Sequence, residues 1–409
     1  MSSWTKSIFS KNFINLSLNQ GVNTFATIIY TPILFQRLGD ANFGLINLAF
    51  SIIILLSIIV SYGYNLNGPI QITESNNLKA QNFIITDILS LRIFNTLTIL
   101  IICLPLILFF GEANFNRILI FSFIILLNEA LNPLFYLQGK NKIFPHAIIN
   151  LFSKSIYIFL IYFFILDIND AYLANFFYGF SASICVLIFW INYFIKNGFS
   201  NLIVSLKNIK FRLKENLTLF LSSTSTHISL NSSLIILSFF TTNTELGRFT
   251  LSYKIAFIIR MIPVFFIQSA LQNAAKISKQ STQDFNNYVS KYFYNGLIIT
   301  FSFGIFLITF SETIIEVFAD EKIVYSAEIL CILSLIPFLA MLNFKNIIYI
   351  LVYNHKNLLN RATFMCLVFM LISSLVLTYY FSGYGLAVAL IMTEIFSFII
   401  HSILLKNVK

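Results

Sequence analysis

The chain has 409 residues, of which 58% are hydrophobic and only 10% are charged. Soluble domains are about 25% charged, and a charge inside hydrocarbon is costly, so this composition excludes an ordinary water-soluble protein. The formal net charge of +10 would suggest nucleic acid in a soluble protein, but here the position of the basic residues along the chain decides their meaning.

Twelve apolar segments are long enough to cross a bilayer, which takes about 20 residues of helix. The apolar runs are continuous and do not alternate, which excludes β-barrel strands. No stretch between them could form a soluble domain. The sequence therefore predicts an all-α integral membrane protein with about 12 transmembrane helices, at residues 13–35, 43–65, 84–109, 117–137, 146–166, 171–195, 218–240, 249–272, 292–317, 325–352, 361–380 and 384–405.

The basic residues predict the orientation of these helices. Five of the 26 Lys and Arg residues fall inside spans. With a cytoplasmic N-terminus, four others (Arg37, Arg117, Arg248 and Lys322) lie in outer loops, and the remaining seventeen lie in inner loops or ends. Cytoplasmic loops are enriched in Lys and Arg. We therefore expect both termini in the cytoplasm and interpret the basic stretch 196–215 as a cytoplasmic linker, not as a nucleic-acid patch.

That linker divides the chain into two six-helix lobes, residues 1–205 and 206–409. Residues 42–52 can be laid over residues 245–255 at an offset of 203, which places Gly44 on Gly247. Because each half has six spans, both halves run the same way through the membrane, related by an axis along its normal. Transporters built this way bind their cargo in a central cavity between the halves.

Polar residues recur along one face of the first span and of the seventh. The repeat of about four residues is that of one helix face. Ser, Thr and Asn also form hydrogen bonds between membrane helices, but two matching stripes favour a shared water-filled cavity. The stripes are Asn15, Asn19, Asn23 and Thr27 in the first span, and Ser222, Ser225, Ser229 and Ser232 in the seventh.

The five basic residues inside spans are Arg92, Lys154, Lys254, Arg260 and Lys345. Arg260 is the deepest, and a central Arg costs about 2.5 kcal/mol or more, so it should face water, an anion or a buried acid. Lys154 shares its helix face with Asn150, and Lys345 shares its face with Tyr349. A cation beside an aromatic ring suits a sugar phosphate, although the lysines could also snorkel to an interface.

Two acids lie centrally in spans, Glu129 and Glu394. Either could pair with Arg260, and either could carry a proton or cation during transport. Pro133 and Pro263 are candidate bending points of their helices. The four cysteines, which lie in apolar runs, lack the spacing of a metal site. No nucleotide-binding, protease or esterase motif occurs, so we expect a protein that is not an enzyme and has no cofactor or metal.

The opening pattern Asn15…Asn19-Gln20…Asn23…Pro32…Leu38-Gly39…Phe43-Gly44 resembles the first two spans of bacterial polysaccharide flippases. These are the Wzx-type O-antigen and capsule transporters of the multidrug/oligosaccharidyl-lipid/polysaccharide exporter superfamily. The loop Leu137-Gln138-Gly139-Lys140 is also similar. The resemblance extends over the whole chain in span count, two-lobe layout and loop charge.

The resemblance implies an exporter that moves an undecaprenyl-pyrophosphate-linked oligosaccharide from the inner to the outer leaflet of the bacterial cytoplasmic membrane. It implies that cations of the central cavity contact the pyrophosphate. Its partners would be the lipid-linked glycan and membrane lipids, with a polysaccharide polymerase and a chain-length regulator as candidates. The candidate substrate-binding residues are Arg260, Lys154, Arg92, Lys345, Lys254, Asn19, Asn23 and Tyr349.

Three other functions fit a bundle of this kind. A multidrug exporter of the same superfamily usually needs an acid in a lobe, but the first and seventh spans have no Asp or Glu. A lipid II flippase typically has two further spans. A scaffold for glycosyltransferases or a polymerase is the third, and a polymerase would be expected to have a large outer loop, whereas the outer loops here are short.

Overall fold

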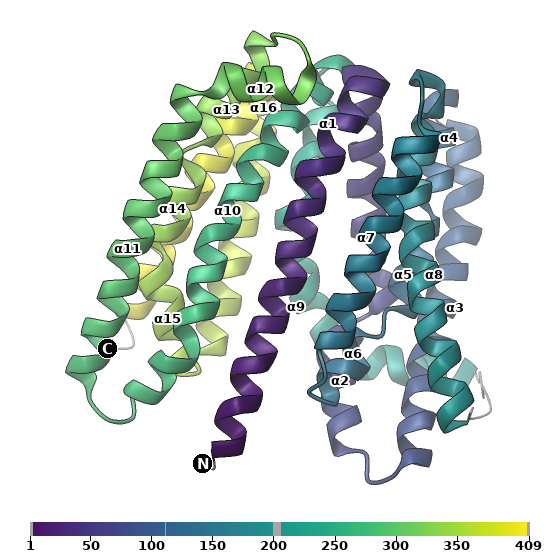
Figure 1. Ribbon diagram of the computed structural model, residues 1–409, viewed down its shortest axis with the longest axis vertical. Helices are drawn as coiled ribbons and strands as arrows, with labels where there is room; N and C mark the ends of the chain where they lie inside the picture. Colours follow the sequence, from purple (N-terminus) through teal and green to yellow (C-terminus); the bar gives the residue numbers. More distant parts are fainter. Residues whose placement is uncertain (1–2, 111, 199–205, 407–409) are drawn as a thin grey trace. The chain divides into compact units, whose positions relative to one another are not determined.

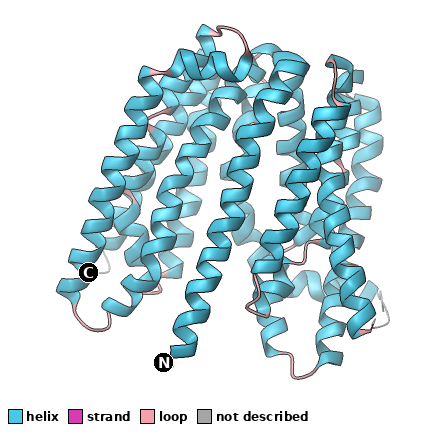
Figure 2. Cartoon of the chain, in the orientation of Figure 1, coloured by secondary structure: helices cyan, strands magenta, loops and turns pink. Residues whose placement is uncertain are grey.

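The computed structural model describes the backbone of residues 3–110, 112–198 and 206–406, and the side chains of 20–108, 112–198 and 211–406 apart from positions 222, 226, 230 and 356. Helices form throughout these ranges, without strands (Figure 2). The all-α prediction is thus confirmed. In chain order the helices are α1 (Ser3–Ser61), α2 (Tyr64–Glu74), α3 (Leu78–Phe110), α4 (Ala113–Ser122), α5 (Ile124–Leu131), α6 (Leu134–Gly139), α7 (Phe144–Phe164), the 3-10 turn η1 (Ile168–Asp170), α8 (Ala171–Asn197), α9 (Leu206–Ser238), α10 (Asn243–Ile277), α11 (Thr282–Thr309), α12 (Ser311–Ala319), α13 (Val324–Leu333), α14 (Ile336–Leu342), α15 (Phe344–Val352) and α16 (Lys356–Lys406).

Nine segments in the described part of the chain are long and apolar enough to cross a membrane. Two of the nine carry two predicted spans each, because α1 bends at Gly39 and α16 bends at Ser382. The nine segments therefore account for eleven of the twelve predicted spans. The remaining span, 218–240, lies in α9, which is less apolar because Ser, Thr and Asn occupy so many of its positions.

The contacts divide the chain into two compact units. Unit 1 is Met1–Gly39 with Leu45–His227, and unit 2 is Asp40–Gly44 with Ile228–Lys409. The predicted boundary at 205/206 follows the basic linker, whereas the contacts continue unit 1 to the middle of α9. The reason is that α9 begins on unit 1, where Arg212 Nε lies 2.9 Å from Asp87 Oδ2 of α3.

The core of unit 1 is built from α2, α3, α6 and α8. Tyr64, Ile88, Phe135 and Trp190 are among its buried side chains. The indole nitrogen of Trp190 donates a hydrogen bond of 2.6 Å to the carbonyl of Leu131 at the end of α5. This bond ties α8 to the point where the fourth span is interrupted.

The core of unit 2 is built from α10, α11, α14 and α15, which lie together in Figure 1. Small residues on α10, Ala270 and Ala274, let the rings of Phe285 and Phe344 pack closely against that helix. Pro263 lies within α10, which runs as one helix from Asn243 to Ile277.

The fourth and tenth predicted spans are interrupted in the same way. Each consists of three short helices, α4–α6 in unit 1 and α13–α15 in unit 2 (Figure 1). The second break falls at Asn132-Pro133 in one and at Asn343 in the other. Pro133 has no backbone N–H to continue a helix, so the predicted bend there is confirmed. Such breaks free backbone carbonyls inside the bundle, and polar side chains must satisfy them.

Candidate functional site

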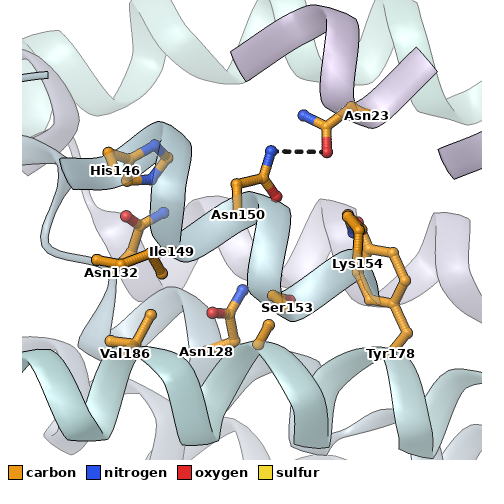
Figure 3. Close-up of a pocket in the computed structure, with 11 residues that line it drawn as sticks. Asn23, Asn128, Asn132, His146, Ile149, Asn150, Ser153, Lys154, Tyr178 and Val186 are labelled. Atoms are coloured by element: carbon orange, nitrogen blue, oxygen red, sulfur yellow. Dashed lines mark hydrogen bonds between the residues drawn. The ribbon is translucent and has the colours of Figure 1, made fainter. Parts of the chain in front are cut away.

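A polar pocket lies inside unit 1, among α1, α5, α7 and α8 (Figure 3). It encloses about 150 Å³, and amide and hydroxyl groups form most of its wall. Of the described residues that line it, Lys154 and His146 are basic and none is Asp or Glu. The lining residues are Asn23, Asn128, Asn132, His146, Ile149, Asn150, Ser153, Lys154, Tyr178, Ala182 and Val186.

Helix α7 contributes more lining residues than any other helix, because its polar residues are spaced so that they lie on one face. His146, Asn150 and Lys154 follow one another at intervals of four residues, which places them on one helix face. Ser153 lies beside them, and all four line the pocket. The predicted pairing of Asn150 with Lys154 on one face is therefore confirmed.

Lys154 is buried, with 6% of its surface exposed. Its Nζ lies 3.5 Å from the centre of the Tyr178 ring, which gives it a cation–π contact. Among the described residues, no carboxylate oxygen lies within 4.0 Å of this nitrogen. A buried ammonium without a counter-ion is costly, so an anion that enters the pocket would gain this charge as its partner.

The first span reaches the pocket through Asn23. The Nδ2 of Asn150 donates a hydrogen bond of 3.0 Å to Oδ1 of Asn23, which joins α7 to α1 (Figure 3). Thr27, one turn later, donates to the backbone carbonyl of Asn23 at 2.8 Å. Part of the predicted polar stripe thus faces a polar pocket, while the side chains of Asn15 and Asn19 lie outside the described residues.

His146 offers a free polar atom at the other end of the wall. Its Nδ1 is buried and has no hydrogen-bond partner in the described structure. Such groups are rarely left unsatisfied in proteins. The pocket therefore has capacity for a polar guest or for water.

Arg92 has a different environment, since its side chain is completely buried. Its guanidinium donates to Oδ1 of Asn65 at 2.8 Å and to the carbonyl of Asn132 at 3.2 Å. It also lies 4.9 Å from the ring centre of Phe135. Arg92 thus satisfies a carbonyl freed by the break at Pro133, and in this conformation it has no surface for a substrate.

Glu129 is linked to the same network. One carboxylate oxygen accepts a hydrogen bond of 3.1 Å from Nδ2 of Asn65, the residue that also accepts from Arg92. Asn65 thus connects the acid to the arginine. Glu129 was one of the two predicted partners of Arg260, and the structure places it in this network of unit 1.

Arg260 of unit 2 pairs with the other predicted acid. Its Nε and Nη2 donate to Oε1 of Glu394 at 2.8 and 2.6 Å, across from α10 to α16. The side chains are 28% and 14% exposed, respectively. Phe257, one turn earlier on α10, has its ring centre 5.5 Å from the guanidinium. The predicted pairing of Arg260 with a central acid is therefore confirmed for Glu394, and the pair is partly buried.

The other predicted basic residues of unit 2 lie beside aromatic rings. Lys345 donates to Ser290 at 3.1 Å and lies 4.6 Å from the ring centre of Phe293. Tyr349, one turn along α15, donates a hydrogen bond to Oδ1 of Asn286. These contacts join α15 to α11. Lys254 lies 5.4 Å from the ring centre of Phe43.

Metal ligands do not gather anywhere in the part of the chain that the structure describes. No three His, Cys, Asp or Glu residues there lie close enough to hold an ion. The polar groups of the sites described above are amides, hydroxyls and single basic side chains.

The fold is that of the transporters of the MOP superfamily. It matches the inward-facing conformation of a multidrug resistance MATE family transporter with a TM-score of 0.73 at 14% identity, over 97% of this chain and 99% of the other. It matches the lipid II flippase MurJ, inward closed, with a TM-score of 0.73 at 15% identity, over 95% of this chain and 87% of MurJ. At such identities the likeness shows the fold alone.

The family follows from the sequence match. The model described as "Polysaccharide biosynthesis protein" matches residues 9–272, more than half of the chain. The chain therefore belongs to the polysaccharide biosynthesis protein family and is a multi-pass membrane protein. A relative from Escherichia coli K12, named "Putative O-antigen transporter", is 23% identical over 391 residues, which are 94% of this chain and 93% of the relative. The resemblance seen in the opening motif is confirmed.

Proposed function

We propose that this protein is a flippase that moves undecaprenyl-pyrophosphate-linked oligosaccharide repeat units from the inner to the outer leaflet of the bacterial cytoplasmic membrane by alternating access. One observation carries the proposal. In this member of the polysaccharide biosynthesis protein family, Lys154 is buried in an amide-lined pocket, and none of the described residues places a carboxylate beside it. The name of the Escherichia coli relative and the flippase fold of MurJ support the same class of substrate.

The pocket suits one polar group of such a substrate. Lys154 would attract a phosphate or another anionic group, and the amides of Asn23, Asn128 and Asn150 can donate to and accept from sugar hydroxyls. Its volume of about 150 Å³ is below the roughly 300 Å³ at which pockets for drug-sized ligands begin. It would therefore hold a phosphate or one sugar ring while the rest of the repeat unit lies outside it.

The remaining predicted contacts are part of the proposal. Arg260 would contact substrate by exchanging Glu394 for a phosphate, and Lys345 with Tyr349 would offer a cation beside a ring. Lys254, Asn19 and the other polar residues of the first span would line the path that the substrate takes through the protein. Arg92 would act through Asn132, whose carbonyl it holds at the wall of the pocket.

The membrane potential can drive this export. A diphosphate carries about two negative charges, and its outward movement follows the inside-negative potential. At about 2.3 kcal/mol per charge per 100 mV, this amounts to roughly 4–5 kcal/mol. Glu129 and Glu394 are the proposed carriers of a coupled proton or cation. If Glu129 carries a proton, export by Glu129→Gln becomes insensitive to an electroneutral potassium/proton exchanger, which removes the proton gradient, leaves the membrane potential and still slows export by the parent.

The proposed setting follows the charge of the loops. Both termini would lie in the cytoplasm, and the basic inner loops would attract the anionic lipid from the inner leaflet. A polysaccharide polymerase and a chain-length regulator would act on the exported repeat unit. We propose that the chain transports its substrate without changing it chemically.

Deletion of the gene tests the proposal directly. We expect pyrophosphate-linked repeat units to accumulate in the inner leaflet and surface polysaccharide to disappear, with both effects reversed by the gene on a plasmid. Normal surface polysaccharide in the deletion strain would rule the flippase out. A parallel test of resistance to organic cations separates the multidrug alternative, because the buried Lys154 would repel such drugs; raised resistance on expression would favour that alternative.

A further inference from the structure

A five-residue segment of α1 belongs to a different unit from the chain on both sides of it. Asp40–Gly44 packs in unit 2, whereas the residues up to Gly39 and from Leu45 onward pack in unit 1. The segment is held by an ion pair of 2.5 Å between Oδ2 of Asp40 and Nε of Arg248 on α10. Lys254, also on α10, lies over the ring of Phe43.

Two glycines allow the backbones to meet at this segment. A Cβ added to Gly44 would lie 2.7 Å from the Asn243 carbonyl oxygen and 2.7 Å from the Gly247 nitrogen. A Cβ added to Gly247 would collide with the Asp40 carbonyl. Neither glycine has a positive φ, so closeness and not backbone conformation requires glycine there.

These approaches are reciprocal under the offset of 203 residues found in the sequence. That offset places Gly44 on Gly247 and Asp40 on Asn243. Gly44 approaches Asn243, and Gly247 approaches Asp40. Residues that are equivalent under the offset thus make equivalent contacts. The contact thus supports the predicted internal repeat at this position, where sequence identity alone is low.

The chain on either side of the segment is anchored to unit 1. Before it, Arg37 donates to the carbonyls of Tyr162 and Ile165 at the end of α7, at 2.6 and 2.8 Å. After it, Asn175 of α8 donates to the carbonyl of Ile46 at 2.8 Å. Gly39, at φ 70°, is the non-helical residue of α1, and α1 is helical from Asp40 to its end.

From these anchors we propose that Asp40–Gly44 and Asn243–Arg248 form a clasp that opens and closes in each transport cycle. The proposal rests on the alternating access proposed above. When the units move relative to each other, the rigid helix after Gly39 must follow unit 1, to which most of its length is bound. Its first five residues then leave unit 2, and Gly39 permits the change of direction because glycine tolerates positive φ. The two glycines, Asp40 and Arg248 are thus positioning residues for transport.

Alanine at either glycine tests the clasp. Gly247→Ala and Gly44→Ala should each lower export at least tenfold at normal membrane level, because the added methyl group holds the backbones apart. Gly21→Ala is the matched control on the same helix, since no described atom lies within 4 Å of the Cβ that it adds. Wild-type export by both Gly247→Ala and Gly44→Ala would overturn the proposal.

A second measurement does not depend on the cargo. In a variant whose four native cysteines are serine, Asp40→Cys is exposed to a water-soluble maleimide in isolated membranes. Adding Gly247→Ala should raise the labelling rate several-fold, whereas adding Gly21→Ala should not. Equal labelling in all three variants would refute the clasp even if the flippase assignment stands. The reverse combination, raised labelling in a protein that exports no glycan, would keep the clasp and reject the flippase.

A reversible lock completes the test. Asp40→Cys with Arg248→Cys is bridged by a short bifunctional methanethiosulfonate, and intact mass confirms the bridge. We expect the bridged protein to lose the transport that the unbridged double variant retains, and to regain it on reduction. The same treatment should leave each single cysteine variant at its own untreated level of transport, which is expected to lie below that of the parent because the ion pair is lost. Undiminished transport by the bridged protein would show that the clasp stays closed throughout the cycle.

Discussion

Unit 1 and unit 2 each contain a basic side chain within the bundle, but the two side chains have different partners. In unit 1, Lys154 is buried over the ring of Tyr178, with no carboxylate in range among the described residues. In unit 2, Arg260 is bound to Glu394 by two hydrogen bonds. The first cation can accept an anion without losing a partner, whereas the second must exchange one.

This difference suggests that Lys154 binds an anion directly, whereas Arg260 can bind one only after Glu394 has been displaced. A ring gives a desolvated cation about 2 kcal/mol or more, whereas a full negative charge at about 4 Å gives about 4 kcal/mol at an effective dielectric constant of about 20. The unit 1 pocket would therefore gain from an incoming phosphate. The pair in unit 2 resists release and would open only when a stronger anion or a proton displaces it. We therefore propose that the substrate first meets Lys154 in unit 1 and that Arg260 binds it later, when Glu394 is displaced.

The largest effect is expected from Arg260→Ala. A harmless Arg260→Ala change would contradict the importance that we give to the ion pair of unit 2. It leaves Glu394 as a buried charge without its cation, which costs about 3–5 kcal/mol where burial is complete, and less at this partly exposed pair. We expect membrane level and thermal stability in detergent to fall and export to be lost, with Arg260→Lys keeping part of both.

The double variant Arg260→Ala with Glu394→Gln is the control for this prediction. It removes both charges, so membrane level should recover while export stays low. Recovery of export as well would mean that the pair only stabilises unit 2 and never meets the substrate.

The next largest effect is expected from Lys154→Met, which keeps the length of the side chain and removes its charge. A charge-assisted hydrogen bond is worth about 1.5–3 kcal/mol, so export should fall about tenfold to hundredfold at unchanged membrane level. Lys154→Arg should retain part of it. Lys196→Met, at an exposed position at the end of α8, controls for the loss of one positive charge. Equal export by the Lys154→Met and Lys196→Met variants would contradict the role given to the pocket.

A smaller effect is expected from Asn150→Ala. This change removes the hydrogen bond to Asn23 that joins α7 to α1, and such a bond contributes about 1 kcal/mol. Export should fall about two- to tenfold. Asn23→Ala should give a similar loss, and the double variant should be no worse than either single variant if the bond is what matters. Additive losses would show that the two amides act separately on the substrate.

The fold could be predicted largely from the sequence because lipid demands continuous apolar helices. Composition and run length located the spans, and Pro133 marked a break. The sequence separated two spans at residues 36–42 and two more at 381–383, but it could not show that each pair is joined by a bend at one non-helical residue, Gly39 in α1 and Ser382 in α16. The division inside α9 could not be predicted, because it depends on Arg212 reaching Asp87, a partner more than a hundred residues away.

The site could be predicted only in part. The deep cations and the acids were visible because charges are rare in apolar spans. The sequence offered both Glu129 and Glu394 as partners of Arg260, and the structure selects Glu394. Tyr178 and His146 were missed, since one more aromatic residue in a chain with 47 Phe and 19 Tyr carries no signal. The burial of Arg92 could not be predicted either. Arg92 is held inside by the carbonyl of Asn132, which is freed at a helix break distant in the sequence.

The smallest effect is expected from Tyr178→Phe, which tests how unit 1 holds its cation. The described contacts of Tyr178 with Lys154, Phe50 and Tyr157 all use the ring and not the hydroxyl. The phenylalanine ring keeps the cation–π contact, so export should change less than about twofold. Tyr178→Leu fills similar space without a ring and should lower export several-fold. If Tyr178→Phe were instead as harmful as Tyr178→Leu, the hydroxyl would be a substrate contact, and the unit 1 pocket would recognise its guest through oxygen as well as charge.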